Sequence, residues 1–331
     1  MVAYIARRVA IMIPMLVLLS IIAFVIIQLP PGDYLTTYIN ARIAAGEVFN
    51  EAEIDRLRAQ YGLDQSVYVQ YYKWMSNILL RGQFGQSFFW GRPVNELLSE
   101  RLPLTLAVSF SSLLVVYILA IPIAIVSAIY KYSWFDVLAT TFGFVGLATP
   151  DFLIALVVSW LFFMLSGRMV TSLFSLPFRD APWSFAKFLD LVSNAWLPVL
   201  IIGLSGTAGL IRTLRATLLD ELSRPYVVTA RSKGLTETRL LFKYPVRIAM
   251  NPVFSTIGWL LPGLINGGVI VGIVLNLQMI GPVLMQATLT QDMYLAGSIV
   301  LILGVLTVIG TLISDILLAW LDPRIRYGAG G

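Results

Sequence analysis

The sequence predicts an all-α polytopic membrane protein, with six transmembrane helices and a helical outer loop after the first of them. Only 12% of the 331 residues are charged, whereas a soluble domain carries about 25%. The mean hydropathy is +0.83. Six separate apolar stretches are each long enough to cross the roughly 30 Å hydrocarbon layer as a helix. Hydrocarbon, not water, is therefore the predicted environment of most of this chain.

The composition also excludes several classes of protein. The chain has no cysteine and no histidine, which removes disulfide frameworks, histidine-based triads and proton relays, and most transition-metal sites. The formal charge of +5 comes from basic residues spread along the chain, a pattern typical of cytoplasmic loops and not of a nucleic-acid-binding tail. We therefore predict no catalytic, cofactor-binding or metal-binding residue in this chain, and no nucleic-acid partner.

The six predicted spans follow one another along the chain, with approximate limits 9–29, 104–129, 137–165, 196–219, 251–277 and 295–320. The first has the look of a signal peptide because Arg7 and Arg8 precede an apolar run. However, the run is longer than about 15 residues, and no small-residue cleavage pattern follows Gln28. We predict a retained helix.

The charges of the loops predict the orientation. An even number of spans places both termini on one side of the membrane. If that side is cytoplasmic, more than half of the 23 lysines and arginines lie in inner segments, eight of them between Arg212 and Arg247. The two short outer loops hold only Arg168, Arg179 and Lys187. Because positive charge gathers in cytoplasmic loops, both termini are predicted to be cytoplasmic.

The segment between the first two spans is polar enough to be a small ordered domain. Asn50 is placed to cap a helix with Glu53 at its third position, and Gly62 is placed to end that helix. Four aromatic residues then recur at helical spacing: Tyr68, Tyr71, Tyr72 and Trp74. Two interpretations are open. One is an amphipathic helix whose Tyr and Trp anchor it at the membrane interface, and the other is a docking surface for an external binding protein.

The segment between the fourth and fifth spans predicts two short cytoplasmic helices joined by a glycine. Pro225 suits a first helical turn, and Gly234 supplies a left-handed stop about two turns later. Thr236 is placed to cap the next helix, with Glu237 at its positive end. Two interpretations are open here as well: a connector packed on the bilayer surface, or a rigid knob that enters a partner's groove and transmits motion to the flanking spans.

The first of these two helices is predicted to have two different sides. Tyr226, Val227 and Ala230 form an apolar face, and Arg231 and Lys233 form a basic flank. The apolar face suits either interpretation of the loop, because it would pack equally well on lipid or on protein.

Several ordered motifs carry a resemblance to a known family. The run Tyr-x-x-Thr-Ala-Arg-Ser-Lys-Gly-Leu at 226–235 resembles the EAA loop of binding-protein-dependent ABC importer permeases. It is closest to the first membrane subunit of the dipeptide/oligopeptide family. Other motifs agree over nearly the whole chain: Tyr4-Ile5-Ala6-Arg7-Arg8, Pro31-Gly32-Asp33, Tyr61-Gly62-Leu63-Asp64-Gln65, Gly82-Gln83-Phe84-Gly85-Gln86-Ser87, Arg101-Leu102-Pro103-Leu104-Thr105-Leu106 and Leu321-Asp322-Pro323-Arg324-Ile325.

The resemblance implies a type I ABC importer permease fold within a heteromeric importer. Such a permease lies in membrane lipid and works with a second permease subunit, two cytoplasmic ATPase subunits that use ATP and Mg²⁺, and a periplasmic substrate-binding protein. The chain itself has no GxxxxGK[ST] phosphate loop, so ATP hydrolysis is expected in the partner. The positions that match the ATPase-coupling segment are Arg224, Pro225, Tyr226, Thr229, Ala230, Arg231, Ser232, Lys233, Gly234 and Leu235.

The implied function is import of peptides or a related small solute from periplasm to cytoplasm by alternating access. The implied location is the bacterial or archaeal cytoplasmic (inner) membrane. On this basis the chain divides into an N-terminal cytoplasmic end with the first span (1–30), a periplasmic helical loop region (31–103), a five-helix transmembrane core (104–321) that contains a cytoplasmic coupling loop (220–247), and a cytoplasmic tail (322–331).

The chain departs from the family pattern at positions expected near the pathway. Gly272 stands where a glutamate usually follows the paired glycines Gly267 and Gly268, and Asp151 replaces a small polar residue. An intramembrane carboxylate usually faces a cavity or a partner. We therefore predict Asp151, Gly268 and Gly272 as candidate translocation-pathway residues. The alternatives are a position at the outer interface for Asp151 and close helix packing for the glycines.

Two other function classes fit the sequence less well. The run Gly203-Leu204-Ser205-Gly206 resembles an intramembrane serine protease motif, but that chemistry needs a general base and the chain has no histidine. The motif is instead predicted to ease helix packing. A transporter or channel driven by an ion gradient would show internal repeats and several intramembrane carboxylates, which this sequence lacks. Asp315 is predicted to contact a basic neighbour at the cytoplasmic end.

Overall fold

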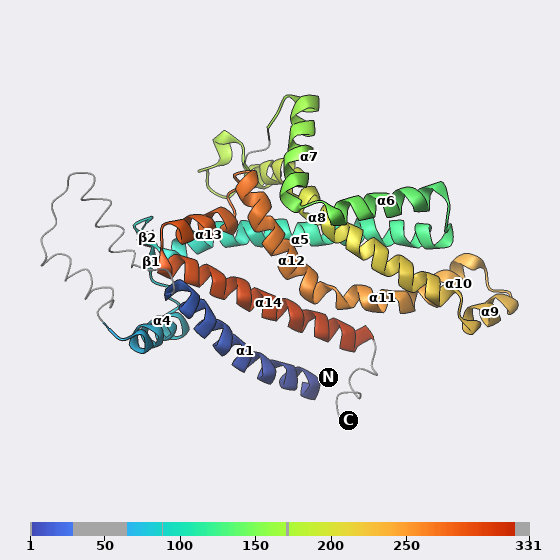
Figure 1. Ribbon diagram of the computed structural model, residues 1–331, viewed down its shortest axis with the longest axis horizontal. Coiled ribbons are helices and arrows are strands. Elements are labelled where there is room, and N and C mark those ends of the chain that lie inside the picture. Colours follow the sequence, from blue (N-terminus) through green and yellow to red (C-terminus); the bar gives the residue numbers. More distant parts are fainter. Residues whose placement is uncertain (1, 29–64, 88, 170–171, 322–331) are drawn as a thin grey trace, which may run out of the picture. The chain divides into compact units, whose positions relative to one another are not determined.

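The computed structural model describes residues 2–28, 65–87, 89–169 and 172–321, and these residues are almost entirely helical (Figure 1). The all-α prediction is confirmed, apart from one short hairpin formed by β1 (Gln86–Ser87) and β2 (Arg92–Pro93). The predicted helix from Asn50 to Gly62 lies outside the described residues.

The chain divides into two compact units. Unit 1 comprises Met1–Val9, Thr105–Gln278 and Thr307–Gly331. Unit 2 comprises Ala10–Leu104 and Met279–Leu306.

Four described helices are long and apolar enough to cross a membrane: α1 (Val2–Gln28), α5 (Val94–Ile129), α8 (Phe185–Leu222) and α14 (Met293–Leu321). They confirm the first, second, fourth and sixth predicted spans. α5 begins well before the predicted limit at 104 because polar contacts support its first turns. The Arg92 guanidinium donates to Glu96 (3.2 Å) and to Glu100 (2.6 Å).

The third predicted span is not one continuous helix. It consists of α6 (Trp134–Ala148) and α7 (Asp151–Ser166), which meet at an angle of 114°. Figure 1 shows α7 turning away from the line of α6. The cause is Pro150, which lacks an N–H for the helix ladder and holds Thr149 in an extended conformation with ψ 126°. The prediction of an uninterrupted helix over 137–165 is therefore wrong.

The fifth predicted span is also divided, between α11 (Pro245–Ser255) and α12 (Ile257–Val274). The break falls at Thr256, whose hydroxyl donates to the Val253 carbonyl at 2.7 Å. The Tyr117 hydroxyl of α5 bonds to the same carbonyl at 3.0 Å, so the break leaves this acceptor satisfied. The described residues therefore hold four helices of spanning length, or five with the bent pair, where six were predicted.

Helix α8 lies at the centre of unit 1 and packs against α6, α7, α11 and α12. Glycines allow this close packing. A methyl group at Gly203 would lie 3.3 Å from the Ser112 carbonyl oxygen, and one at Gly206 would lie 3.2 Å from the Leu260 side chain. The predicted packing role of these small residues is confirmed. Unit 1 also contains the short helix η1 (Leu176–Phe178) and two short helices between α8 and α11, described below.

Unit 2 is built around α4 (Val67–Arg81), α13 (Ile280–Leu289) and the parts of α1, α5 and α14 within its limits. The helical spacing predicted for the four aromatic residues of α4 is confirmed. Its inner face holds Trp74, which packs with Phe24 and Leu301, and Tyr71, whose hydroxyl lies 2.7 Å from that of Ser20. Its outer face presents Tyr68 and Tyr72.

Candidate functional site

The loop between α8 and α11, predicted to be cytoplasmic, folds as a helix, a glycine turn and a second helix. α9 (Pro225–Ser232) has Pro225 in its first turn, and α10 (Glu237–Lys243) follows. Gly234 between them has φ +76°, in the left-handed region that glycine adopts at low cost. The predicted helix–glycine–helix order is confirmed. Thr236 occupies the N-cap position of α10, but its side chain makes no capping hydrogen bond.

The loop has a small core of its own. Val227 and Ala230 of α9 are buried against Leu240 of α10, with Tyr226, Leu235 and Tyr244 packed around them. Val227 and Leu240 are both 0% exposed. The apolar face predicted for α9 therefore exists, but α10 already covers it. This favours the rigid knob over a connector that lays its apolar face on the bilayer.

The opposite side of α9 is exposed and uncharged. It presents Val228, Thr229 and Ser232. The Thr229 hydroxyl donates to the Pro225 carbonyl at 3.0 Å, and the Ser232 hydroxyl donates to the Val228 carbonyl at 3.1 Å. Because both hydroxyl protons are donated within the helix, entry of this outer face into a protein groove leaves no hydroxyl donor unpaired.

The basic flank of α9 is tied to α10. The Arg231 guanidinium donates to both carboxylate oxygens of Glu237, at 2.5 and 3.0 Å. Hydrogen bonding from Arg231 lowers the pKa of the Glu237 carboxyl. This two-point contact closes the Gly234 turn from outside, while Lys233 next to it is exposed. The flank therefore helps to hold the two helices together.

Helix α9 is also fixed to the end of α8. The Tyr226 hydroxyl donates to the Glu221 carboxylate at 2.5 Å, and Arg224 lies 3.8 Å from the same carboxylate. Burial, with the hydrogen bond to Glu221, raises the pKa of Tyr226. A displacement of α9 must therefore displace the last turn of α8. The structure brings the predicted coupling residues together on one small body at this point.

The candidate pathway residues lie on α7 and α12. Asp151 is the first residue of α7, directly after the Pro150 bend. A methyl group at Gly267 of α12 would lie 3.0 Å from the Asp151 carboxylate. Gly268 and Gly272 are buried on the same helix. The sequence did not single out Gly267 as a partner of Asp151, because the contact depends on the bend between α6 and α7.

Three further polar contacts each join two separate segments of unit 1. Arg8 forms an ion pair with Asp315 at 3.1 Å, as predicted for Asp315. The Gln278 side chain accepts from the Leu173 amide at 3.2 Å and so holds the loop between α7 and α8. Sequence reasoning missed this contact. It also counted Arg215 as a loop charge, although Arg215 lies inside α8 and pairs with Asp136 at 2.6 Å.

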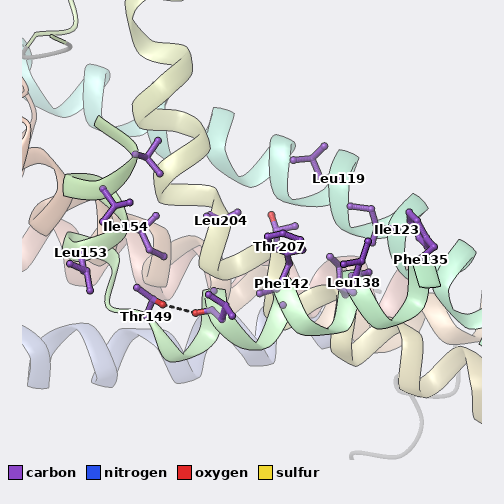
Figure 2. Close-up of a pocket in the computed structure, with 18 of the residues that line it drawn as sticks. Leu119, Ile123, Phe135, Leu138, Phe142, Thr149, Leu153, Ile154, Leu204 and Thr207 are labelled. Carbon is purple, nitrogen blue, oxygen red and sulfur yellow. Dashed lines mark hydrogen bonds between the residues drawn. The ribbon is translucent and has the colours of Figure 1, made fainter. Parts of the chain in front are cut away.

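An apolar cavity of about 710 Å³ lies between α5, α6, α7 and α8 (Figure 2). Its wall includes Leu119, Phe142, Leu153 and Leu204, and its few polar groups include the Thr149 hydroxyl, which donates to the Val145 carbonyl at 2.7 Å. None of the residues that line it is charged. The lining therefore offers no charged group to a bound molecule.

Comparisons with known proteins agree with this architecture. Residues 120–327 match the family described as "Binding-protein-dependent transport system inner membrane component", and residues 1–109 match the N-terminal model of such membrane components. The oligopeptide transport system permease protein AppB of Bacillus subtilis is 35% identical, covering 99% of this chain and 100% of the relative.

Two further relatives extend the comparison. A Brucella abortus protein, provisionally named as a peptide transport system permease, is 31% identical over 99% of this chain and 100% of its own length. The glutathione transport system permease protein GsiC of Salmonella paratyphi A is 29% identical over 99% of this chain and 100% of its own length. With its bent helix pair, span-length helices and helix–glycine–helix loop, this chain belongs to the family of inner-membrane components of binding-protein-dependent transport systems.

Proposed function

We propose that this chain is a permease subunit of an ATP-driven importer for small peptides, and that α9 is the element through which a cytoplasmic ATPase acts on it. The cargo class is supported by the relatives, whose names refer to oligopeptide, peptide and glutathione transport. The proposed partners are a second permease, two ATPase subunits that use ATP and Mg²⁺, and a periplasmic substrate-binding protein.

The observation that carries this proposal is the construction of the cytoplasmic loop. Its apolar residues pack against one another around Val227 and Leu240, so the loop is a folded body and not an extended connector. Its exposed side is small, and the two hydroxyls on that side donate to backbone carbonyls of the same helix. Its base is attached to α8 through Tyr226 and Glu221. A body of this kind can be pushed by a partner and can pass the displacement to a spanning helix.

The proposed orientation places α9 and both termini in the cytoplasm, as the loop charges favour. Alternating access then requires that α8, and the helices packed on it, tilt when the ATPases close and open. The proposed pathway is bordered by Asp151, Gly268 and Gly272. The approach of the Asp151 carboxylate to Gly267 supports a location at the α7–α12 contact. No observation favours transport driven by an ion gradient.

Reconstitution in vesicles tests this function. The complete transporter is placed in proteoliposomes with the binding protein and a labelled peptide. ATP is supplied on the ATPase side, or an ion gradient is imposed without ATP. We expect uptake only with ATP and Mg²⁺. Uptake driven by the ion gradient alone contradicts the proposal.

Two matched variants locate the ATPase contact. Val228→Asp places a charge on the exposed face of α9, and Thr238→Asp places the same charge on an exposed position of α10. Burying an unpaired carboxylate in a protein groove costs several kcal/mol. We therefore expect V228D to lose ATPase association and ATP-dependent uptake, while T238D keeps most of both. Equal uptake by V228D and the unmodified protein removes α9 from the contact.

A further inference from the structure

We propose that Asp136 and Arg215 form a positioning joint that carries the displacement of the cytoplasmic loop to the bent pair α6 and α7. This inference rests on the proposed function of α9 and concerns residues on other helices. Asp136 lies in the first turn of α6, and Arg215 lies in the last third of α8. Their hydrogen bonds join them to each other and to residues 127–140, and not to α9 or α10.

The Arg215 guanidinium and the Asp136 carboxylate form a bidentate ion pair, a fork of two hydrogen bonds. Arg215 donates through Nε to one Asp136 oxygen at 2.6 Å and through Nη2 to the other at 2.7 Å. The Asp136 side chain is 4% exposed and that of Arg215 is 23% exposed. A two-point contact fixes both the distance and the angle between its partners, as a lysine ammonium does not.

Asp136 also forms hydrogen bonds with the end of α5 and with the turn before α6. Its carboxylate accepts hydrogen bonds from the Ser127 hydroxyl and from the Tyr132 amide, the latter at 2.8 Å. Tyr132 has φ +63°, a strained value for a residue with a side chain, and its bond to Asp136 holds that turn. The Ser133 hydroxyl accepts from the Asp136 amide at 3.2 Å and caps α6. Three helices therefore meet at this carboxylate.

The joint lies on the route from α9 to the bend. Arg215 precedes Glu221, which holds Tyr226 of α9, by six residues or about 9 Å along the axis of α8. On the other side, α6 runs from Asp136 to the Pro150 bend, beyond which Asp151 faces Gly267. When the end of α8 moves, the fork must move the base of α6 with it.

Stability alone is a poor reason to bury such a pair. Removing two charges from water is costly, and apolar replacements of similar shape are often as stable. Nearby α8 residues such as Leu214 and Leu218 are apolar and fully buried, in contrast to this charged pair. Apolar packing does not fix the angle between two helices as a two-point hydrogen-bonded contact does. Transmission of movement from one helix to another requires such a fixed angle.

The test replaces the fork without removing the charge. Arg215→Lys keeps the cation but loses the two-point contact. Arg8→Lys is the matched control in the other unit 1 ion pair, with Asp315. Each variant transporter is purified with its ATPases, and peptide uptake and ATP hydrolysis are measured in the same proteoliposomes. Asp136→Asn is a second variant, which keeps the shape of the carboxylate and removes its charge.

For R215K we expect unchanged association of the ATPases and continued ATP hydrolysis, with peptide transported per ATP reduced by about tenfold, a typical size for coupling between distant sites. R8K should keep the ratio of the unmodified protein. Two results overturn the inference: an unchanged ratio in both R215K and D136N, or loss of assembly in R215K, which would show a purely structural role. If the unmodified transporter takes up no peptide with ATP, the proposed function fails instead.

Discussion

At the scale of single residues, the contact between Asp151 and Gly267 is the most informative departure from the sequence-based predictions. Two positions on separate helices constrain each other, because the carboxylate fills the space that a side chain at Gly267 would need. The sequence indicated that Asp151 was unusual and that Gly267 belonged to a glycine pair, but not that the two residues meet. Their meeting depends on the 114° bend at Pro150, which places the start of α7 against α12.

This contact predicts a change of sign in a double-mutant cycle. Gly267→Ala places a methyl group 3.0 Å from the Asp151 carboxylate, and overpacking of this kind costs about 1–3 kcal/mol. In an Asp151→Ala background the space is free. The same change should then be neutral or stabilising, because alanine favours a helix by about 1 kcal/mol over glycine.

The midpoint of thermal unfolding of the purified protein reports this cycle. G267A should lower the midpoint in the unmodified chain and leave it unchanged or raise it in the D151A chain. An equal shift in both backgrounds would mean that the two residues do not compete for space.

The same carboxylate is proposed to border the pathway, which predicts an effect of its charge. Asp151→Asn keeps the size of the side chain. A charged hydrogen bond to a cationic group of the cargo is worth about 1.5–3 kcal/mol, so peptide uptake should fall by roughly ten- to a hundredfold. Asp180→Asn, at an exposed position in the loop between α7 and α8, is the control. Unchanged uptake and substrate affinity in D151N place Asp151 away from the pathway.

At the scale of elements, local signals predicted the loop between α8 and α11 well. Pro225 at the start of α9 and Gly234 after its end act through their own backbone preferences, so no distant partner is needed to predict them. The contact partners were not predictable in this way. The cover of α10 over Val227 and the bond of Arg231 to Glu237 depend on how the turn folds back.

The Arg231–Glu237 bond predicts a titration. The lowered pKa of Glu237 means that the bond stabilises the loop fully above the ordinary carboxyl value of 4.5 and is lost as the pH falls through the lower folded value. Side-chain carboxyl chemical shifts of labelled protein should show a midpoint below 4.5 for Glu237. Arg231→Gln should bring that midpoint back up. A midpoint at or above the ordinary value, unaffected by R231Q, would show that the two side chains are not paired.

The spans were predicted less completely than the loop. Hydropathy located the apolar segments, but Pro150 and Thr256 divide two of them. Thr149-Pro150 was a visible signal for the first break, since a residue before proline avoids the helical region. The second break has no comparable local signal. It depends on the Tyr117 hydroxyl of α5, which reaches Thr256 at 3.1 Å.

At the scale of the whole molecule, composition was sufficient to predict a polytopic membrane protein, and ordered motifs were sufficient to predict its family. The buried fork between Asp136 and Arg215 was not predictable, because each residue alone reads as an ordinary cytoplasmic charge. Only the packing of α6 on α8 brings them together. At this scale, we propose that a partner ATPase pushes on the exposed face of α9.

Cysteine cross-linking can identify this contact without background, because the chain has no cysteine of its own. Single cysteines at Val228, Thr229 and Ser232 would report the exposed face of α9, and one at Thr238 would serve as the control on α10. In the assembled transporter we predict cross-links from the three α9 positions to an ATPase subunit, with yields that change on ATP binding. Suppose instead that none of the three α9 cysteines cross-links to the ATPase in any nucleotide state, while a cysteine at Thr238 or elsewhere on the surface does. The ATPase contact then does not lie on α9.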